Sequence, residues 1–162
     1  MSERCSRFDW RLAVSIVVPQ AVGVASAFAT MGGVRSWYPG LVKPGFNPPS
    51  WVFGPTWTFL YLLMGVALWL VWRRLGENPQ APRALAAFAL QLLLNGAWSI
   101  LFFGLRAPGV ALVEIVLLWS AITLTIVWFR PVSRAAAALL VPYWLWVGFA
   151  TLLNGSIWYL NA

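Results

Sequence analysis

Long apolar runs separated by short polar or proline-rich breaks make up most of the chain. Five of them approach the roughly 20 residues that a helix needs to cross a bilayer. They are 12–31, 51–72, 84–104, 109–129 and 135–159. The strands of a membrane barrel would instead alternate apolar with polar residues. The pattern therefore predicts an all-α integral membrane bundle of five transmembrane helices, forming a single domain over residues 1–162.

The composition agrees with a membrane environment. Hydrophobic residues make up 61% of the chain and charged residues 9%, whereas a soluble domain has roughly 25% charged residues. The breaks at 73–83, 105–108 and 129–134 are short, so we expect consecutive helices to pack antiparallel. The first apolar run is longer than the roughly 7–15 apolar residues of a signal peptide. We therefore expect it to remain as the first helix.

The eleven basic residues, which contribute to a net charge of +7, are scattered over the termini and loops. They form no stripe of the kind that binds nucleic acid, so we expect no nucleic-acid partner. Three of them, Arg35, Lys43 and Arg106, lie on one predicted side of the membrane. The other side has eight, namely Arg4, Arg7, Arg11, Arg73, Arg74, Arg83, Arg130 and Arg134. The positive-inside rule then predicts a cytoplasmic N-terminus and an outward C-terminus.

Side chains that bind metals are scarce. The chain has no histidine, and its single cysteine, Cys5, can form no internal disulfide. Histidine is the commonest metal ligand in proteins. We therefore expect no metal site and no required cofactor.

The twelve tryptophans divide by their depth in the predicted spans. Trp10, Trp69, Trp72, Trp128 and Trp158 lie at helix ends, where an interfacial aromatic belt explains them. Seven others need another account, because they lie inside spans or beside the first loop: Trp37, Trp51, Trp57, Trp98, Trp119, Trp144 and Trp146. The phase of Trp119 and Trp144 leaves them open between core and lipid.

Helical phase groups aromatic and amide side chains on three faces. The faces are Phe53, Trp57 and Tyr61; Gln91, Asn95, Trp98 and Phe102; and Tyr143, Trp146, Ala150 and Asn154. Amide and carboxyl groups avoid lipid, so Glu114 also faces inward and is protonated or bonded to an amide such as Asn95. Two interpretations follow: an aromatic cavity with few polar anchors, or a packed core in which the amides join helices.

The first loop, 32–50, is long for a helix connection, which usually has roughly 2–8 residues. Its aromatic residues, among them Trp37, Tyr38 and Phe46, favour burial, and its prolines restrict the backbone. We expect an ordered lid over one end of the bundle. Pro19 and Pro142 lie inside spans and are expected to kink their helices.

Three segments, WYPGLVKPGFNPPSWVFGPTW (37–57), QLLLNGAWSILFFG (91–104) and PYWLWVGFATLLN (142–154), resemble the TspO or translocator protein family. Members are also called tryptophan-rich sensory proteins or peripheral-type benzodiazepine receptors. The resemblance implies a five-helix bundle, commonly a homodimer, that binds tetrapyrroles such as protoporphyrin IX. In animals it also implies binding of cholesterol and of benzodiazepine-site drugs.

The same motifs imply a set of ligand-binding residues. These are Trp37, Tyr38, Pro48, Trp57, Gln91, Asn95, Trp98, Phe102, Glu114, Trp146, Ala150, Leu153 and Asn154. The family usually has Asp at the position of Glu114. The two indoles that the resemblance links to porphyrin breakdown are Trp57 and Trp146.

Two positions depart from the family pattern. Gly155 stands where the cholesterol motif has Tyr, and no basic residue follows Tyr159. Phe46 replaces a tryptophan often found in the loop. We therefore expect a membrane-embedded binding protein for a hydrophobic ligand, best a metal-free tetrapyrrole, that acts as sensor, carrier or stress regulator. The alternatives are a light-dependent porphyrin-degrading enzyme and a structural subunit of a larger membrane complex.

Overall fold

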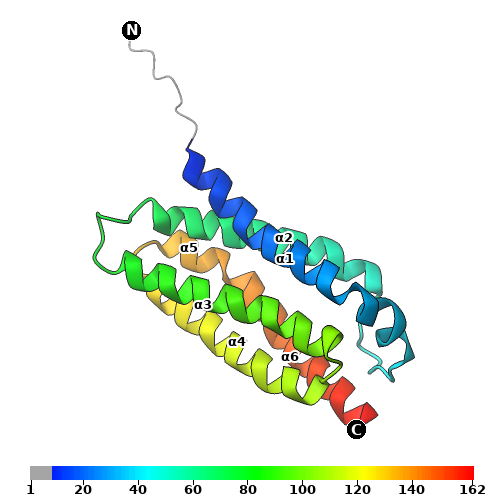
Figure 1. The fold of residues 1–162 in the computed structure, drawn as a ribbon. Helices are drawn as coiled ribbons and strands as arrows, with labels where there is room; N and C mark the ends of the chain where they lie inside the picture. The colour runs from blue at the N-terminus through cyan, green and yellow to red at the C-terminus, as the bar shows by residue number, and fades with distance from the viewer. Residues whose placement is uncertain (1–8) are drawn as a thin grey trace.

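A computed structural model describes residues 9–162, and every regular element in that part of the chain is helical (Figure 1). The elements are α1 (Trp10–Ser36), η1 (Tyr38–Gly40), α2 (Ser50–Trp72), α3 (Ala81–Ser99), η2 (Ile100–Gly104), α4 (Pro108–Phe129), α5 (Arg134–Leu139) and α6 (Val141–Asn161). Five helical stretches are long and apolar enough to cross a membrane. The predicted five-helix fold is confirmed. Arg4, Cys5 and Arg7 lie outside the described residues.

The first helix is longer than the sequence predicts. It continues through Gly32 and Gly33 to Ser36, so the first loop comprises residues 37–49. Gly33 allows this extension, because a Cβ at that position would collide with the backbone carbonyl of Phe103. The helix therefore needs glycine for close packing, and the glycine pair does not end it.

The prolines in the spans act differently. α1 is one continuous helix through Pro19. The last span is broken at Leu140, just before Val141 and Pro142 begin α6. Proline has no N–H and collides with the preceding turn, so it suits the first turn of a helix better than its interior. Where a kink is expected at Pro142, the span instead divides at Leu140 into α5 and α6, and Pro142 lies in the first turn of α6.

The helices form a ring in which α1 contacts α2 and α3, α3 contacts α4, and α4 contacts α6. α5 closes the ring against α2, whereas α2 makes few contacts with α6. We call the end with the first loop and the C-terminus the loop end, and the opposite end, with the breaks 73–80 and 130–133, the arginine end (Figure 1). The ring is therefore closed more tightly at the arginine end than at the loop end.

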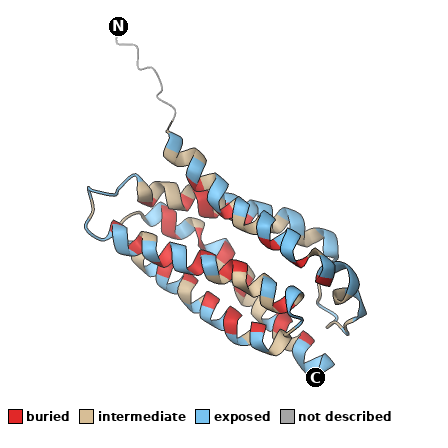
Figure 2. Cartoon of the chain, viewed as in Figure 1, coloured by how far each residue is buried: buried red, intermediate tan, exposed pale blue. Residues whose placement is uncertain are grey.

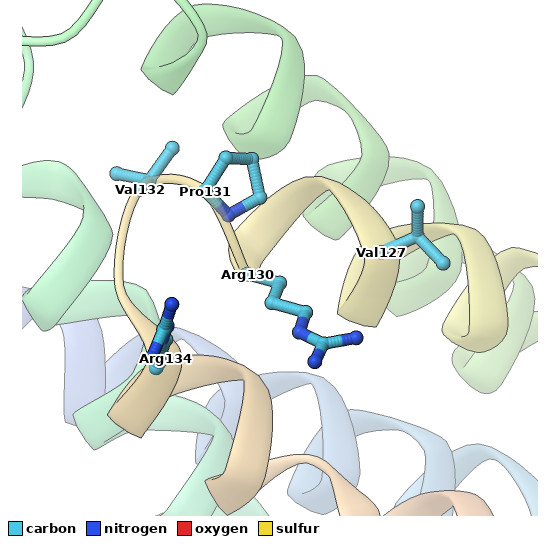
Figure 3. Close-up of a pocket in the computed structure, with 5 residues that line it drawn as sticks. All are labelled: Val127, Arg130, Pro131, Val132 and Arg134. Carbon is cyan, nitrogen blue, oxygen red and sulfur yellow. The ribbon is translucent and has the colours of Figure 1, made fainter.

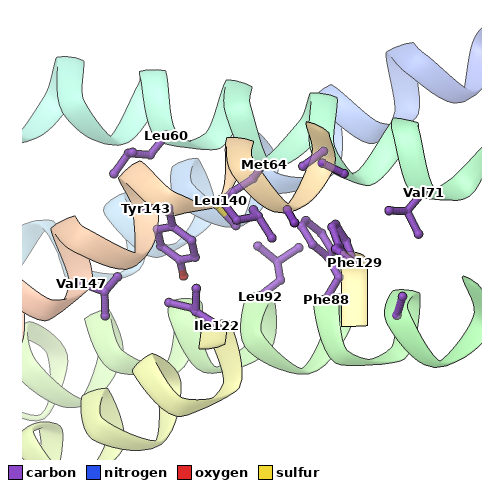
Figure 4. Close-up of a cluster of buried hydrophobic side chains, with 14 of the residues drawn as sticks. Leu60, Met64, Val71, Phe88, Leu92, Ile122, Phe129, Leu140, Tyr143 and Val147 are labelled. Carbon is purple, nitrogen blue, oxygen red and sulfur yellow. The ribbon is translucent and has the colours of Figure 1, made fainter. Parts of the chain in front are cut away.

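The main core lies toward the arginine end (Figure 4). Met64, Phe88, Phe129, Leu140 and Tyr143 are fully buried there. The rings of Phe88 and Phe129 stack with centroids 5.9 Å apart. Much of α1 is exposed (Figure 2), as expected for a helix that faces lipid. A smaller buried cluster of Phe102, Ala111, Leu153 and Ile157 lies at the loop end.

Candidate functional site

A cavity of about 1010 Å³ lies at the loop end, between α1, α2, α6 and the last turns of the third span. Its wall is mainly apolar. The aromatic residues that line it are Tyr38, Phe53, Trp57, Tyr61, Trp98, Phe102, Phe103 and Trp146. Among the described residues of the lining, Lys43 is the only one with a charged side chain. The cavity therefore suits a large apolar molecule that carries few negative charges.

Nine of the thirteen predicted binding residues line this cavity. They are Tyr38, Pro48, Trp57, Trp98, Phe102, Trp146, Ala150, Leu153 and Asn154. The other four, Trp37, Gln91, Asn95 and Glu114, lie outside the lining. Most of the predicted set thus meets in one place although it comes from the first loop and three helical spans.

The α2 wall carries the aromatic face that the helical period indicated. Trp57 stacks on Tyr61 with ring centroids 5.4 Å apart, and its edge meets Tyr143 of α6 at 6.3 Å. One turn nearer the loop, Phe53 meets Trp146 of α6 edge to face at 5.9 Å. These rings occupy the space between α2 and α6, where the two helices make few contacts. Large side chains thus line the most loosely packed seam of the bundle.

Trp98 and Asn154 form a polar contact at the wall. The Trp98 indole N–H donates to Asn154 Oδ1 at 3.1 Å, and Asn154 Nδ2 donates to the Pro108 carbonyl at 2.8 Å. Trp98 also stacks on Phe102, with centroids 5.3 Å apart. The Asn154 amide therefore has partners within the protein, and its main effect is to fix the Trp98 ring in the wall.

Asn95 joins three helices beside the cavity. The Tyr61 hydroxyl donates to Asn95 Oδ1 at 2.7 Å, and Asn95 Nδ2 donates to the Tyr143 hydroxyl oxygen at 3.0 Å. Asn95 lies outside the lining, whereas Tyr61 is part of it. Asn95 therefore positions Tyr61. The partnership with the two tyrosines is not visible in the sequence, although the helical period had placed all three residues on inward faces.

Glu114 is expected to be protonated or bonded to an amide such as Asn95, and the second alternative is wrong. The oxygen and the nitrogen of the Asn95 amide are both engaged by tyrosines, and neither Glu114 oxygen has a hydrogen-bond partner within residues 9–162. The Gln91 side chain, 1% exposed, likewise has no partner in the described chain. Both groups are buried, and neither residue is among those that line the cavity. An inward phase does not specify whether a side chain reaches the cavity or the packed interior.

Trp37 and the first loop close the loop end. Trp37 caps α1 and packs edge to face on Phe102 at 5.8 Å, behind the lining. The Tyr38 hydroxyl donates to Asn47 Oδ1 at 3.0 Å, which links the two ends of the loop. Burial raises the pKa of Tyr38 above its ordinary value, so it stays protonated and can donate.

The loop is also joined to the C-terminus and carries the cavity's lysine. The Val42 backbone N–H donates to Asn161 Oδ1, and Asn161 Nδ2 donates to the Val42 carbonyl, both at 2.9 Å. Lys43 Nζ donates to the carbonyls of Pro39 and Leu41 at 3.2 and 3.1 Å and lies 4.8 Å from the Tyr38 ring centroid. Lys43 therefore lies at the cavity, on a loop segment that these hydrogen bonds hold in place.

Trp119 and Trp144, whose roles the sequence left open, pack between α4 and α6. Their rings stack with centroids 4.9 Å apart, and the Trp119 indole N–H donates to the Trp144 carbonyl at 3.2 Å. The Trp144 indole N–H donates to Thr123 Oγ1 at 2.8 Å. Neither residue lines the cavity. These two indoles are helix-packing residues.

The fold and the cavity together define a class of protein: a five-helix membrane bundle with an aromatic cavity under a proline-rich loop. Comparison with known families agrees, since the sequence model of the TspO/MBR family matches residues 15–160. The chain belongs to this family.

Similar proteins occur in archaea, bacteria and animals. The chain is 46% identical over 152 residues to the tryptophan-rich protein TspO of Archaeoglobus fulgidus, covering 94% of this chain and 97% of that one. It is 42% identical over 152 residues to the human translocator protein, covering 92% and 89%. It is 35% identical over 153 residues to the tryptophan-rich sensory protein of Cereibacter sphaeroides, covering 94% and 93%.

Proposed function

We propose that the protein binds a tetrapyrrole of the protoporphyrin IX type in the loop-end cavity and acts as a sensor, carrier or stress regulator. The aromatic cavity is the observation that carries this proposal. Its volume of about 1010 Å³ lies at the upper end of the roughly 300–1,000 Å³ of ligand pockets. A flat macrocycle offers two π faces, which pair well with rings such as Trp57, Trp98 and Trp146.

Polar contacts to such a ligand would be few. The amide of Asn154 is already bonded within the protein. Lys43 is the exception, because its two backbone carbonyl partners are neutral and a carboxylate would be a stronger partner. We therefore propose that Lys43 meets a propionate of the ligand while the aromatic wall holds the ring. The free-base porphyrin is preferred, because the chain has no histidine to serve as an axial ligand.

A titration with protoporphyrin IX, followed by the porphyrin's own absorbance, tests the proposal in detergent. Trp146→Leu removes a cavity ring, and Trp144→Leu makes the same change two residues away, outside the lining. An aromatic pair is worth about 0.5–1.5 kcal/mol, so Trp146→Leu should weaken binding about three- to tenfold. Trp144→Leu should leave the affinity of the folded protein unchanged. Equal affinities for the wild type and Trp146→Leu would exclude this site.

The charge on the ligand can be tested separately. Lys43→Gln should weaken binding of protoporphyrin IX about threefold, as expected for a partly exposed ion pair. The same variant should bind the dimethyl ester of protoporphyrin IX as tightly as the wild type does, because the ester has no carboxylate. An equal loss for acid and ester would show that Lys43 acts through the shape of the loop.

A second candidate function is light-dependent breakdown of the bound porphyrin. Trp57 and Trp146, the two indoles linked to this reaction by family resemblance, both line the same cavity. Illumination of the complex in air should then produce new absorption bands that Trp146→Leu abolishes at saturating porphyrin. An unchanged porphyrin spectrum after illumination leaves binding without breakdown as the function.

Orientation and assembly complete the proposal. We propose a cytoplasmic N-terminus, an outward C-terminus and a homodimer embedded in lipid. The single cysteine, Cys5, reports the first of these. In intact cells it should react with a membrane-impermeant maleimide only after lysis. Light scattering of the purified protein, corrected for bound detergent, should give the mass of two chains.

Competition with a benzodiazepine-site drug would show whether such drugs share the porphyrin site.

A further inference from the structure

The arginines at the arginine end differ in whether their side chains have partners. Four of the six that the structure describes there are engaged: Arg11 over Trp10 at 6.0 Å, Arg73 over Trp69 at 4.9 Å, Arg83 over Trp128 at 5.5 Å, and Arg74 with Glu77 at 3.2 Å. Arg130 and Arg134 have no ion-pair, hydrogen-bond or ring partner for their guanidinium groups within residues 9–162. Two of the six guanidinium groups therefore have no partner in the part of the chain that the structure describes.

These two arginines line one hollow. It has a volume of about 430 Å³ and lies between the last turn of α4 and the first turn of α5 (Figure 3). The other lining residues, Val127, Pro131 and Val132, are apolar. Val127, in the last turn of α4, is 57% exposed. The hollow thus combines two cations with an apolar strip that continues along α4 toward the membrane interior.

The connection that carries the hollow is held in one conformation by hydrogen bonds. The backbone N–H groups of Val132 and Ser133 both donate to the Phe129 carbonyl, at 3.0 and 2.7 Å. From the neighbouring break, Asn78 Nδ2 lies 3.4 Å from the Pro131 carbonyl, a long hydrogen bond. The backbone positions of Arg130 and Arg134 are therefore held relative to each other, and both side chains line the same hollow.

The described acidic side chains are not available to neutralise the hollow. Asp9 accepts from the Trp69 indole and the Arg11 backbone N–H, and Glu77 pairs with Arg74. Glu114 is buried in α4, about four turns from Phe129. The anion that partners Arg130 and Arg134 must then come from outside the described chain. At the end of a membrane span, the abundant anions are lipid phosphates.

We propose that the hollow between Arg130 and Arg134 binds the phosphodiester headgroup of an anionic membrane lipid. Guanidinium groups bind phosphate oxygens in a bidentate manner, and two of them flank this site. The first methylene groups of an acyl chain then lie on Val127, the exposed residue on the membrane side. This apolar contact favours a phospholipid over a free phosphate ion, whose hydration shell gains nothing from valine. The site lies at the opposite end from the aromatic cavity and does not depend on what the cavity binds.

Native mass spectrometry of the full-length protein tests the proposal. The protein is released from mixed micelles of phosphatidylglycerol and phosphatidylcholine, and the lipids retained per chain are counted. One phosphatidylglycerol should be retained in preference to phosphatidylcholine. The pair Arg130→Gln and Arg134→Gln should lower its affinity about tenfold or more, since both charge-assisted contacts to the phosphate are lost.

The matched control removes two charges at the same end. Arg73→Gln and Arg83→Gln together should change retention less than about twofold, because those side chains stack on tryptophans. Equal losses in the two double variants would overturn the proposal in favour of diffuse surface charge. No loss in the Arg130 and Arg134 variant would also overturn it.

Two further arms complete the test. Inorganic phosphate, added at constant ionic strength, should not displace phosphatidylglycerol at equal concentration. Displacement would mean that the site binds the ion and not the lipid. Arg130→Lys with Arg134→Lys keeps the charge but loses the planar fork, and should retain an intermediate amount of lipid. The thermal midpoint in pure phosphatidylcholine should be the same for all variants, which shows that each one is folded.

Discussion

The two ends of the bundle use the same five spans in opposite ways. At the arginine end, buried alanines such as Ala67, Ala84 and Ala136 let the helices approach, and Met64 and Phe129 fill the remaining space. At the loop end, the ring of Phe53 meets Trp146 and the ring of Trp57 meets Tyr143 across the seam between α2 and α6, and a cavity of about 1010 Å³ remains. In lipid, close approach of helices depends on small residues. The sizes of the side chains along each helix therefore explain why the arginine end is closely packed and the loop end has room for a ligand.

The largest expected difference between the two ends concerns phenylalanine. Phe129→Ala leaves a hole beside Phe88 in the closed end, and should cost about 3 kcal/mol or more of the free energy of unfolding. Phe53→Ala, at the cavity wall, should cost less than about half as much, because that ring already borders open space. Reversible unfolding in detergent measures both. Equal losses would show that the loop end is as tightly packed as the arginine end.

A glycine pair on α1 tests how closely the helices approach near the cavity. Gly33→Ala places a methyl group against the Phe103 carbonyl, and should cost about 1–3 kcal/mol of stability. At Gly32 a Cβ meets nothing within 4 Å. Gly32→Ala should then stabilise the helix by about 0.5–1 kcal/mol. If both variants were stabilised, α1 would not be in close contact with the third span at this height.

A smaller effect concerns the hydrogen bonds where the two ends meet. Tyr143→Phe removes one partner of Asn95 while Tyr61 keeps its own bond. Interhelical hydrogen bonds in membranes average about 0.6 kcal/mol, with a maximum near 1.7, so the loss should be about 1 kcal/mol. The exposed Tyr159→Phe is the control and should be neutral. An unchanged free energy of unfolding in Tyr143→Phe would show that the Asn95 hydrogen bonds do not stabilise the fold.

The sequence predicts the aromatic residues of the cavity wall better than it predicts the places of the buried polar residues. Helical phase alone groups Trp57, Trp98 and Trp146 on inward faces, because the period of a helix determines which side chains share a face. Phase cannot separate a side chain at the cavity from one in the packed interior at another height. Gln91 and Glu114 are examples: both face inward as predicted, but they are buried in the packed interior and do not line the cavity.

Two local features are visible only in the structure. η2 is a π-helical turn in which the Leu105 N–H bonds the Ile100 carbonyl at 2.8 Å, and Phe102 and Phe103 both reach the cavity from it. The longer α1 depends on Gly33 meeting Phe103. Neither feature has a signature in the apolar pattern. An irregularity near Pro142 is predictable from the sequence, because proline disfavours the helix interior, although the structure shows a break at Leu140 in place of the expected kink.

Filling the cavity tests the central claim most directly. Ala150 of α6 lines the cavity, whereas Leu152, two residues away, is 68% exposed on the outside of the bundle. The measurement is a protoporphyrin IX titration of Ala150→Phe beside Leu152→Phe, with the thermal midpoint of each variant as the check on folding. We predict that Ala150→Phe weakens binding by about a hundredfold or more, since the added ring occupies ligand volume, and that Leu152→Phe binds like the wild type. Wild-type affinity in a folded Ala150→Phe variant would contradict the assignment of this cavity as the binding site.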